Sequence, residues 1–284
     1  MSHFKVAIAS AALVSTYTLA RPVPTKAEAG DAAVKRMDLS RPGDVAPEFD
    51  FSGQIRFAGC SGSVVSFGQP KTANAVALTN GHCIGMMGGD PNAVIVNRPY
   101  ASSANIYYNA EETVRAKTTK ILYGIIQPHD IAFLELDKTY EELEKLGIRS
   151  RLVSPAMATV GTTIVLASGY WDSVATCDVE AIIFEIREDK WVNSNSYKYH
   201  CDAQHGTSGS PLINAETGEV VGANYTGNDD GEECTYNNPC EVDENGNINV
   251  DQGANYGDQV YKIMTCLNAS KDIDLQVAGC SLPK

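Results

Sequence analysis

Short β-rich runs recur along most of this chain, and they limit its possible folds more than any other feature of the sequence. Val, Ile, Leu, Tyr and Phe are concentrated in these runs, while Gly, Asn, Pro and Ser cluster between them. Regularly spaced short strands separated by turn residues are typical of an all-β barrel or sandwich. The predicted strands of the first half are Gln54–Phe57, Ser63–Phe67, Ala75–Leu78, Ala93–Val96, Asn105–Tyr108, Thr118–Tyr123 and Ile131–Leu136.

A second set of β-rich runs follows a junction at residues 137–150. Within the junction, Thr139–Leu146 is helix-like, and Gly147 would end that helix. Residues 227–253 are acidic and rich in Asn and Gly, which indicates a long surface loop. Gln259–Leu267 places apolar residues at helical spacing, so we predict a C-terminal helix. The predicted strands of the second half are Thr162–Ser168, Val179–Ile186, Ser196–Tyr199, Pro211–Asn214 and Glu219–Asn224.

The N-terminal part of the chain has a different composition. Residues 1–20 combine a short basic start, an apolar run too short to span a bilayer, and small residues at the end. We interpret them as a secretory signal peptide, with a surface helix as the alternative. Residues 21–47 are proline-rich and lack aromatic residues, which is typical of a pro-segment or linker, and Lys35-Arg36 is a candidate processing site. This leaves an N-terminal β unit at 48–145 and a C-terminal one at 146–284.

The cysteine count and the net charge limit the compartment and the partners. The chain has 8 cysteines behind the expected signal peptide, which indicates disulfides and secretion into an extracellular or periplasmic space. No Cys-x-x-Cys pair is present, so we expect no metal site. The net charge of -13 would repel phosphate backbones and anionic membranes, so we expect no nucleic-acid or membrane partner.

The strongest candidate for chemistry is Gly206–Pro211, which reads Gly-Thr-Ser-Gly-Ser-Pro. A nucleophilic serine needs a tight turn that exposes its hydroxyl and aims backbone N–H groups at the oxyanion formed on the substrate. Glycine permits the required backbone angles and the close approach of a substrate. The candidate donors of this oxyanion hole are the N–H groups of Gly206 and Ser208. The alternative is an ordinary turn between two strands.

A base and an orienting carboxylate can be assigned as well. A serine hydroxyl is inert unless a base takes its proton. Among the 5 histidines, His82 lies where an apolar strand ends in a turn, and the adjacent Cys83 could tether that turn. Asp130 stands just before an apolar strand, where a partly buried carboxylate can orient an imidazole. Each residue alone is equally well explained as an ordinary loop histidine or turn aspartate.

Taken together, these segments resemble the trypsin/chymotrypsin-like serine proteases. Thr79–Cys83 (Thr-Asn-Gly-His-Cys) is similar to the Thr-Ala-Ala-His-Cys motif of that family. Asp130–Leu134 (Asp-Ile-Ala-Phe-Leu) is similar to its Asp-Ile-Ala-Leu-Leu motif, and Gly206–Pro211 to its Gly-Asp-Ser-Gly-Gly-Pro motif. The order of His, Asp and Ser along the chain is also the order of the family, whereas other triad folds use other orders.

The resemblance implies two antiparallel six-stranded β-barrels with an active site in the cleft between them. The catalytic triad would be His82, Asp130 and Ser208, acting on protein or peptide substrates through an acyl-enzyme and without a cofactor. We expect a monomer. The resemblance also implies a disulfide beside the catalytic histidine, between Cys60 and Cys83. We assign the remaining cysteines to the pairs Cys177–Cys201, Cys234–Cys240 and Cys266–Cys280.

The chain departs from trypsin at the residue before the nucleophile. Trypsin has an aspartate there, which pairs with the N-terminal ammonium released when the zymogen is cleaved. Thr207 cannot form that ion pair. We therefore hypothesise that the zymogen is activated by loss of residues up to the mid-30s or 40s, without an N-terminal insertion switch. The Thr-Ser-Gly-Ser-Pro form is similar to bacterial relatives such as the glutamyl endopeptidases, but Asn224 stands where those carry a histidine.

Primary specificity is indicated by residues near the nucleophile. Asp202 and Ala203 stand at the distance before the nucleophile at which trypsin carries its pocket-base pair. A carboxylate there would favour Lys or Arg before the scissile bond. The neighbouring cysteine is displaced relative to trypsin, so a plain loop position for Asp202 is the alternative. The other candidate substrate-binding residues are His205, Asn224 and Tyr225.

Two other hypotheses compete with the hypothesis of an active endopeptidase. One is a catalytically inactive protease-like binding module, although no triad residue is missing. The other is a disulfide-stapled β protein with chance motifs. Residues 243–251 alternate oxygen-bearing side chains in the manner of a calcium loop, but they lack its turn glycine and its closing glutamate, which favours a solvated loop.

Overall fold

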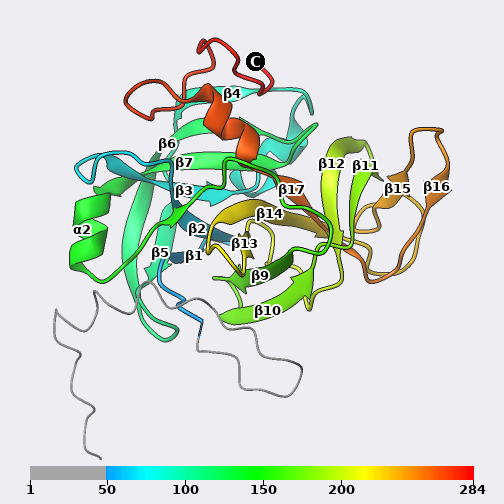
Figure 1. Cartoon of the computed structure of the whole chain (residues 1–284), viewed down its shortest axis with the longest axis horizontal. Coiled ribbons are helices and arrows are strands. Elements are labelled where there is room, and N and C mark those ends of the chain that lie inside the picture. Colours follow the sequence, from blue (N-terminus) through cyan, green and yellow to red (C-terminus); the bar gives the residue numbers. More distant parts are fainter. Residues whose placement is uncertain (1–48) are drawn as a thin grey trace, which may run out of the picture. The chain divides into compact units, whose positions relative to one another are not determined.

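The computed structural model describes residues 49–284, and the expected signal peptide and pro-segment fall outside this described part. The described residues form two β-sheets connected through a short helix, α2 (Tyr140–Lys145), and a following loop (Figure 1). The Thr139 side chain accepts a hydrogen bond from the N–H of Glu142, and the Glu142 carboxylate accepts one from the N–H of Thr139. This capping box explains why the predicted helix begins where it does. Among residues 49–284, no helix has the length and apolar character needed to cross a bilayer.

The first sheet closes on itself. Six antiparallel strands follow the order β1-β5-β6-β7-β3-β2, and the pairing of β2 with β1 completes the barrel. The short strand β4 is added beside β6, and β8 pairs with β2, so this sheet extends slightly past the predicted boundary at residue 145. The strands are β1 (Gln54–Arg56), β2 (Ser61–Ser66), β3 (Asn74–Thr79), β4 (Ile95–Pro99), β5 (Ser103–Tyr107), β6 (Thr113–Ile125), β7 (Ile131–Thr139) and β8 (Arg151–Leu152).

The second sheet has nine strands in the order β10-β9-β13-β14-β17-β12-β11-β15-β16. All of its neighbouring strands are antiparallel. The predicted all-β class with two β units is therefore confirmed. The strands are β9 (Thr163–Ser168), β10 (Ser173–Asp178), β11 (Ala181–Glu188), β12 (Trp191–Tyr199), β13 (Pro211–Asn214), β14 (Val220–Gly227), β15 (Cys240–Val242), β16 (Ile248–Asn249) and β17 (Asn255–Gln259).

Strand β7 shows how one sequence pattern supports both the barrel and the contact between the sheets. Its first four residues are all buried. Ala132 and Leu134 belong to the cluster inside the first barrel, whereas Ile131 and Phe133 belong to a cluster that includes Ile213 of β13. Because side chains alternate along a strand, a strand buried on both faces reads as a continuous apolar run. Each such large side chain stabilises the fold by about 1.5–3 kcal/mol on burial.

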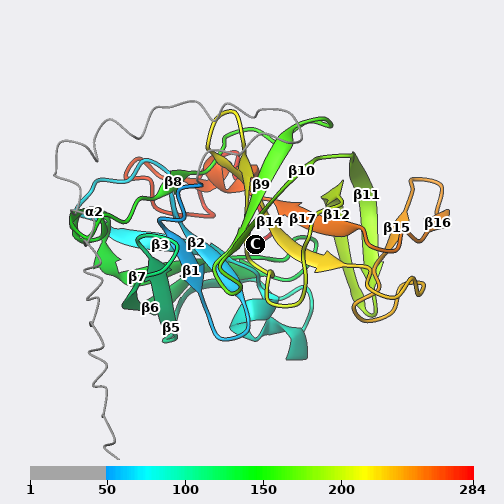
Figure 2. The same ribbon diagram turned by 90° about the horizontal axis from the view of Figure 1, so that it is seen from below.

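The predicted surface loop at 227–253 contains a hairpin. Strands β15 and β16 pair with each other, and β15 extends the sheet beside β11 (Figures 1 and 2). The disulfide between Cys234 and Cys240 lies just before this hairpin. The Asp243 carboxylate accepts hydrogen bonds from the N–H groups of Asn245 and Asn247. Those hydrogen bonds form a turn within residues 243–251, the segment whose oxygen-bearing side chains alternate as in a calcium loop.

The predicted C-terminal helix is present, but it is shorter than predicted and is a 3-10 helix. Gln259 ends strand β17, and only Tyr261–Cys266 is helical, as a 3-10 helix. The disulfide between Cys266 and Cys280 and a bridge between Leu267 and Ile273 turn the chain back immediately afterwards. Helical spacing in the sequence was therefore a correct signal for a helix that the tertiary contacts cut short.

Candidate active site

The ends of three strands bring the candidate triad together. His82 follows β3, and Asp130 directly precedes β7. Strands β3 and β7 pair with Thr79 opposite Ala132, so the two residues beyond that register are neighbours. Ser208 lies in the turn before β13, in the other sheet. All three residues line one cavity.

His82 and Asp130 form a tight pair. The His82 Nδ1 lies 2.5 Å from Asp130 Oδ2, and the backbone N–H of His82 donates to Asp130 Oδ1 at 2.9 Å. An ionised carboxylate only accepts hydrogen bonds, so Nδ1 carries the hydrogen and Nε2 is left to take a proton. Burial lowers the pKa of His82, but the charge and hydrogen bond of Asp130, with a smaller contribution from Glu188, raise it to a net value above the ordinary 6.5.

A second buried group lies behind Asp130. Asp258 on β17 is fully buried, and its Oδ2 accepts the backbone N–H of Asp130 and, at 3.2 Å, the amide of Asn193. His129 lies 3.5 Å from its other oxygen, and the Lys262 ammonium lies 3.1 Å from the far nitrogen of His129. Burial raises the pKa of Asp258, and His129 lowers it in part. The sequence analysis assigned no role to these residues.

The nucleophile turn leaves two backbone donors free. Within residues 49–284, the N–H groups of Gly206 and Ser208 donate no hydrogen bond, whereas those of Thr207, Gly209 and Ser210 donate to backbone carbonyls. Unpaired N–H groups on both sides of one residue are the arrangement that an oxyanion hole requires. The two donors are those that the sequence predicts.

The orientation of the first donor is fixed from outside the turn. The Trp171 indole N–H donates to the His205 carbonyl at 2.7 Å. In a trans peptide the C=O and the N–H point in opposite directions, so the Gly206 N–H points away from the indole. Ser61 Oγ donates to the next carbonyl, that of Gly206, at 2.9 Å. Gly206 has a φ of +98°, and a Cβ there would lie only 2.5 Å from the Tyr170 ring.

The other side of the turn is held by polar side chains. Thr207 Oγ1 donates to the Gln204 carbonyl at 2.7 Å and accepts from the amide of Asn224 at 3.1 Å. The Asn224 oxygen in turn accepts from the Tyr199 hydroxyl at 2.7 Å. Thr207 therefore fills the position of the trypsin aspartate with neutral hydrogen bonds.

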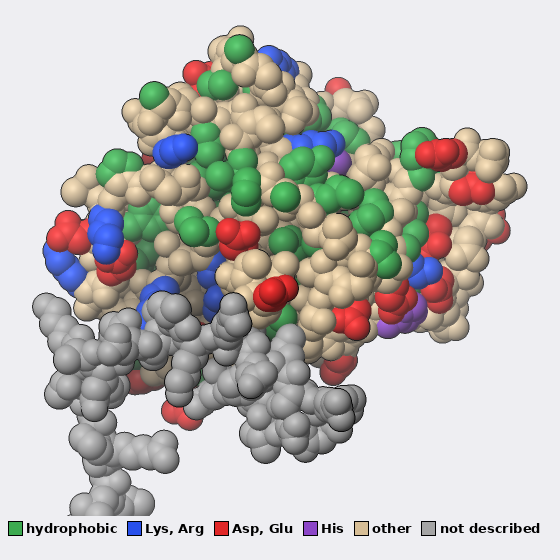
Figure 3. Space-filling view, viewed as in Figure 1, with side chains coloured by type: hydrophobic (Ala, Val, Ile, Leu, Met, Phe, Trp, Pro, Cys, Tyr) green, Lys and Arg blue, Asp and Glu red, His purple; other side chains and the backbone are tan. Residues whose placement is uncertain are grey.

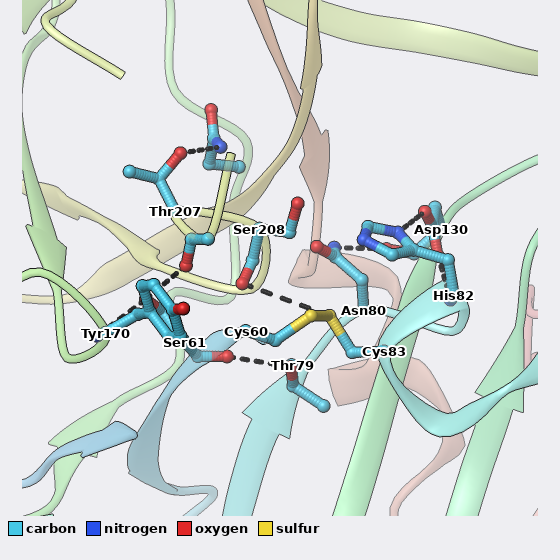
Figure 4. The surroundings of a disulfide bond; sticks show 12 residues. Cys60, Ser61, Thr79, Asn80, His82, Cys83, Asp130, Tyr170, Thr207 and Ser208 are labelled. Atoms are coloured by element: carbon cyan, nitrogen blue, oxygen red, sulfur yellow. Dashed lines mark hydrogen bonds and ion pairs between the residues drawn. A yellow bond between two sulfur atoms is a disulfide. The ribbon is translucent and has the colours of Figure 1, made fainter. Parts of the chain in front are cut away.

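The Cys60–Cys83 disulfide lies between the two halves of the site. Figure 4 shows it with Ser208 on one side and the His82–Asp130 pair on the other. The Ser208 carbonyl accepts the N–H of Ser61 at 2.8 Å. Gly209 packs so closely that a Cβ would lie 2.3 Å from the Ser61 carbonyl oxygen. The four disulfides of the structure are the four assigned pairs, namely Cys60–Cys83, Cys177–Cys201, Cys234–Cys240 and Cys266–Cys280.

The predicted substrate-binding residues separate into two groups. Four of them line the cavity, and they are Ala203, His205, Asn224 and Tyr225. Asp202 does not line it, and its side chain is exposed. Two carboxylates that the sequence analysis did not single out, Asp229 and Glu188, line the cavity instead.

Comparison with known proteins gives one family match and several similar folds. The family model described as the trypsin-like peptidase domain matches residues 60–222, which is more than half of the chain. The fold is similar to that of the apo MamO protease domain from Magnetospirillum magneticum, with a TM-score of 0.50 and 13% identity over 77% of this chain and 97% of that one. The active form of the Rv3671c protease from M. tuberculosis matches with a TM-score of 0.44 and 16% identity over 83% of this chain and 84% of that one.

No curated protein sequence gives a significant match. The two β-sheets and the cavity between their strand ends define a chymotrypsin-like serine protease architecture. The chain belongs to the trypsin-like peptidase family.

Proposed function

We propose that this protein is a secreted serine endopeptidase that hydrolyses peptide bonds through an acyl-enzyme on Ser208. One observation carries the proposal: the free N–H groups of Gly206 and of Ser208 itself lie in the turn of a serine whose cavity also holds the His82–Asp130 pair. A binding module would have no need for two unpaired donors beside a potential nucleophile. Secretion is supported by the four disulfides, which persist in oxidising compartments.

The proposed mechanism follows from the roles of these groups. His82 Nε2 takes the hydroxyl proton of Ser208 as its oxygen attacks the substrate carbonyl. The negative charge that develops on the carbonyl oxygen is stabilised by the N–H groups of Gly206 and Ser208. Asp130 stabilises the imidazolium, which then gives its proton to the leaving amine. Water then attacks the acyl carbonyl as His82 takes one of its protons, and His82 returns that proton to the Ser208 oxygen when the bond to Ser208 breaks and the acid is released.

Between residues 49 and 284, Ser208 Oγ donates no hydrogen bond of 3.5 Å or shorter to His82. In proteases without substrate this contact is often long, and it tightens when the substrate binds.

Activation is proposed to require removal of the N-terminal segment without an insertion switch. Thr207 is already satisfied by Gln204 and Asn224, so no new ammonium group is needed to hold the turn. A preference for Lys or Arg before the scissile bond stays part of the proposal. The carboxylate that supports this preference is Asp229, which lines the cavity and lies 3.0 Å from His205, rather than Asp202.

The proposed activity is tested by treating the secreted protein with a fluorophosphonate and locating the adduct by mass spectrometry, with Ser208→Ala as the control. We expect one adduct on Ser208 and hydrolysis of peptide substrates, both absent in the control. A folded, processed protein that takes up no reagent would instead favour the inactive binding module.

The proposed preference before the scissile bond is tested with a matched pair of variants. Asp229→Asn should lower kcat/KM for Lys and Arg substrates about tenfold relative to norleucine substrates, because a charge pair in the cavity is lost. Asp202→Asn removes the charge of a carboxylate that does not line the cavity, and it should leave that ratio unchanged. The reverse result would restore Asp202 as the specificity residue.

A further inference from the structure

A half-buried carboxylate lies in the active-site cavity without a role in the proposed mechanism. Glu188 ends strand β11 and lines the cavity together with His82. Its Oε2 accepts the hydroxyl of Thr226 at 2.6 Å, and its Oε1 accepts the backbone N–H of Asn237 at 2.9 Å. These two bonds fix the direction of the carboxylate. Each carboxylate oxygen has a further lone pair, so Glu188 can still accept hydrogen bonds from a ligand.

Two aromatic rings border the same part of the cavity. Trp191 and Tyr236 both line it, and their ring centroids lie 6.4 Å apart at an angle of 53°. Tyr236 is 56% exposed, so its ring is accessible from the solvent. The Lys190 ammonium already lies 5.0 Å from the Trp191 ring centroid, a cation–π distance. A carboxylate beside two aromatic rings is a combination that binds an ammonium or guanidinium group on an alkyl stem.

The position of Glu188, Trp191 and Tyr236 in the cavity indicates which residue of a substrate they would bind. The carbonyl that is attacked must lie at Ser208, and Ala203, Asn224 and Asp229 line the same cavity, where the side chain next to that carbonyl would be bound. Side chains of an extended peptide alternate in direction. The preceding side chain therefore points away from the first one, and Glu188, which lines the same cavity and acts electrostatically on His82, is available to bind it.

We propose that Glu188, Trp191 and Tyr236 form a subsite for a Lys or Arg side chain at the second residue before the scissile bond. This inference rests on the proposed function and narrows its substrates to chains with two adjacent basic residues. The neighbouring residue would be held near Asp229, so each basic side chain would meet one carboxylate. The net charge of -13 favours the approach of such cationic segments.

The sequence of the chain itself contains one such segment. Lys35-Arg36 is the only pair of adjacent Lys or Arg residues in all 284 residues. It lies within the stretch expected to be removed, and the mature chain downstream of it has no second pair. A protease with dibasic selectivity would therefore release its own N-terminal segment after Arg36 and leave the rest of the chain uncut.

The first experiment measures kcat/KM of the secreted protein on peptides that share Arg before the scissile bond and carry Lys, norleucine or Glu one residue earlier. We expect Lys to be preferred over norleucine by at least about tenfold, and Glu to be the poorest. Glu188→Gln keeps the shape of the side chain and should reduce the Lys-to-norleucine ratio to near one. Glu185→Gln, on the same strand but outside the cavity, is the matched control and should keep the ratio. Equal rates for Lys and norleucine in the unchanged protein would overturn the proposal.

The second experiment separates this inference from the proposed activity. The affinity of the same peptides for the Ser208→Ala protein is measured by calorimetry, which needs no catalysis. Tighter binding of the Lys peptide, lost in the Ser208→Ala/Glu188→Gln double variant, would support the subsite even if the unchanged protein proved inactive. Hydrolysis without any preference in rate or binding would leave the protease assignment intact and refute the subsite.

A precursor assay completes the test. Full-length Ser208→Ala precursor is incubated with active protein, and the new N-terminus is sequenced. We expect cleavage after Arg36, slowed at least about tenfold by Lys35→Ala. Cleavage elsewhere, or at an unchanged rate in Lys35→Ala, would contradict self-processing at the dibasic pair.

Discussion

The oxyanion hole depends on side chains that lie far from the nucleophile in the sequence. Trp171 holds the His205 carbonyl, and Ser61 holds the Gly206 carbonyl. Trp171 is in turn next to Asp172, which forms a salt bridge of 2.7 Å with Arg56 of the first barrel. Both partners of that salt bridge are partly exposed, so we expect it to contribute little to the free energy of unfolding.

The contribution of Trp171 can be measured by removing its donor. Trp171→Phe keeps an aromatic ring but loses the hydrogen bond to His205, so the Gly206 peptide is free to rotate. We expect kcat to fall about tenfold with little change in KM, because the lost interaction matters only when the oxyanion forms. Steady-state kinetics would show this. Tyr170→Phe, which keeps its ring against Gly206, is the control, and an equal loss there would argue for a general packing effect.

The pH dependence of activity follows from the charges around His82. The base must be neutral, so kcat/KM should fall as the pH drops through the His82 pKa, which Asp130 and Glu188 hold above the ordinary value. Removing the Glu188 charge destabilises the imidazolium and lowers that pKa. In Glu188→Gln the acidic limb of the profile should therefore move to lower pH, measured with a peptide that has norleucine at the second position. A limb that stays in place would mean that Glu188 does not act on His82.

The candidate catalytic residues were accessible to short motifs, because each motif describes local chemistry, and the structure brings all three to one cavity. Their supporting groups could not. Trp171 and His205 are 34 residues apart, and Asp130 and Asp258 are 128 apart. Asp202 was chosen for its distance from Ser208 along the chain, but the displaced cysteine at 201 belongs to the disulfide with Cys177, and Asp202 lies outside the cavity.

At the scale of structural elements, two of the disulfides should contribute similarly to stability but differently to activity. Cys60–Cys83 lies beside the triad, whereas Cys266–Cys280 joins the C-terminal segment to the helix before it. The sequence separations are 23 and 14 residues, so removing either bridge should cost about 3 kcal/mol of unfolding free energy by loop closure.

Serine double variants of each pair test this difference. Denaturant unfolding should show similar losses for the two proteins. Under conditions where both are folded, only the Cys60→Ser/Cys83→Ser protein should lose kcat, because His82 is adjacent to Cys83 and the Ser208 carbonyl packs against its sulfur. A comparable loss of kcat in the Cys266→Ser/Cys280→Ser protein would mean that the effect is global.

Most strands could be recognised in the sequence, since alternating or continuous apolar runs leave a local signal. Strand β10 could not, because its residues are mostly exposed and it is recruited by pairing with β9. Strand β17 was partly hidden as well, since its five buried residues, Asn255–Gln259, include only one apolar side chain. Strands β10 and β17 form because neighbouring strands pair with them, and their own composition does not predict a strand.

At the scale of the whole molecule, the negative charge is unevenly spread. Figure 3 shows acidic side chains gathered at the end of the molecule where β15 and β16 lie in Figure 1. Together with Asp229 and Glu188 in the cavity, this field should accelerate the encounter with cationic substrates.

The ionic strength dependence of kcat/KM tests this steering. For a Lys-Arg peptide, kcat/KM should fall several-fold between about 0.01 M and about 0.3 M salt, because the Debye length shrinks from roughly 30 Å to less than 8 Å. A peptide with norleucine at both positions should show little change. Parallel behaviour of the two peptides would exclude electrostatic steering of the substrate.

The sequence by itself determined the β class, predicted the three candidate triad residues that line one cavity, and predicted the two N–H groups that are unpaired within residues 49–284. These features are local: an apolar alternation, a glycine-flanked serine, or a carboxylate before a strand has the same meaning wherever it stands in the fold. Only the tertiary structure decided which carboxylates line the cavity and which side chains hold the peptide groups of the candidate oxyanion hole. Glu188, Asp229 and Trp171 act through neighbours that pairing of distant strands brings to them, and no spacing along the chain encodes that proximity.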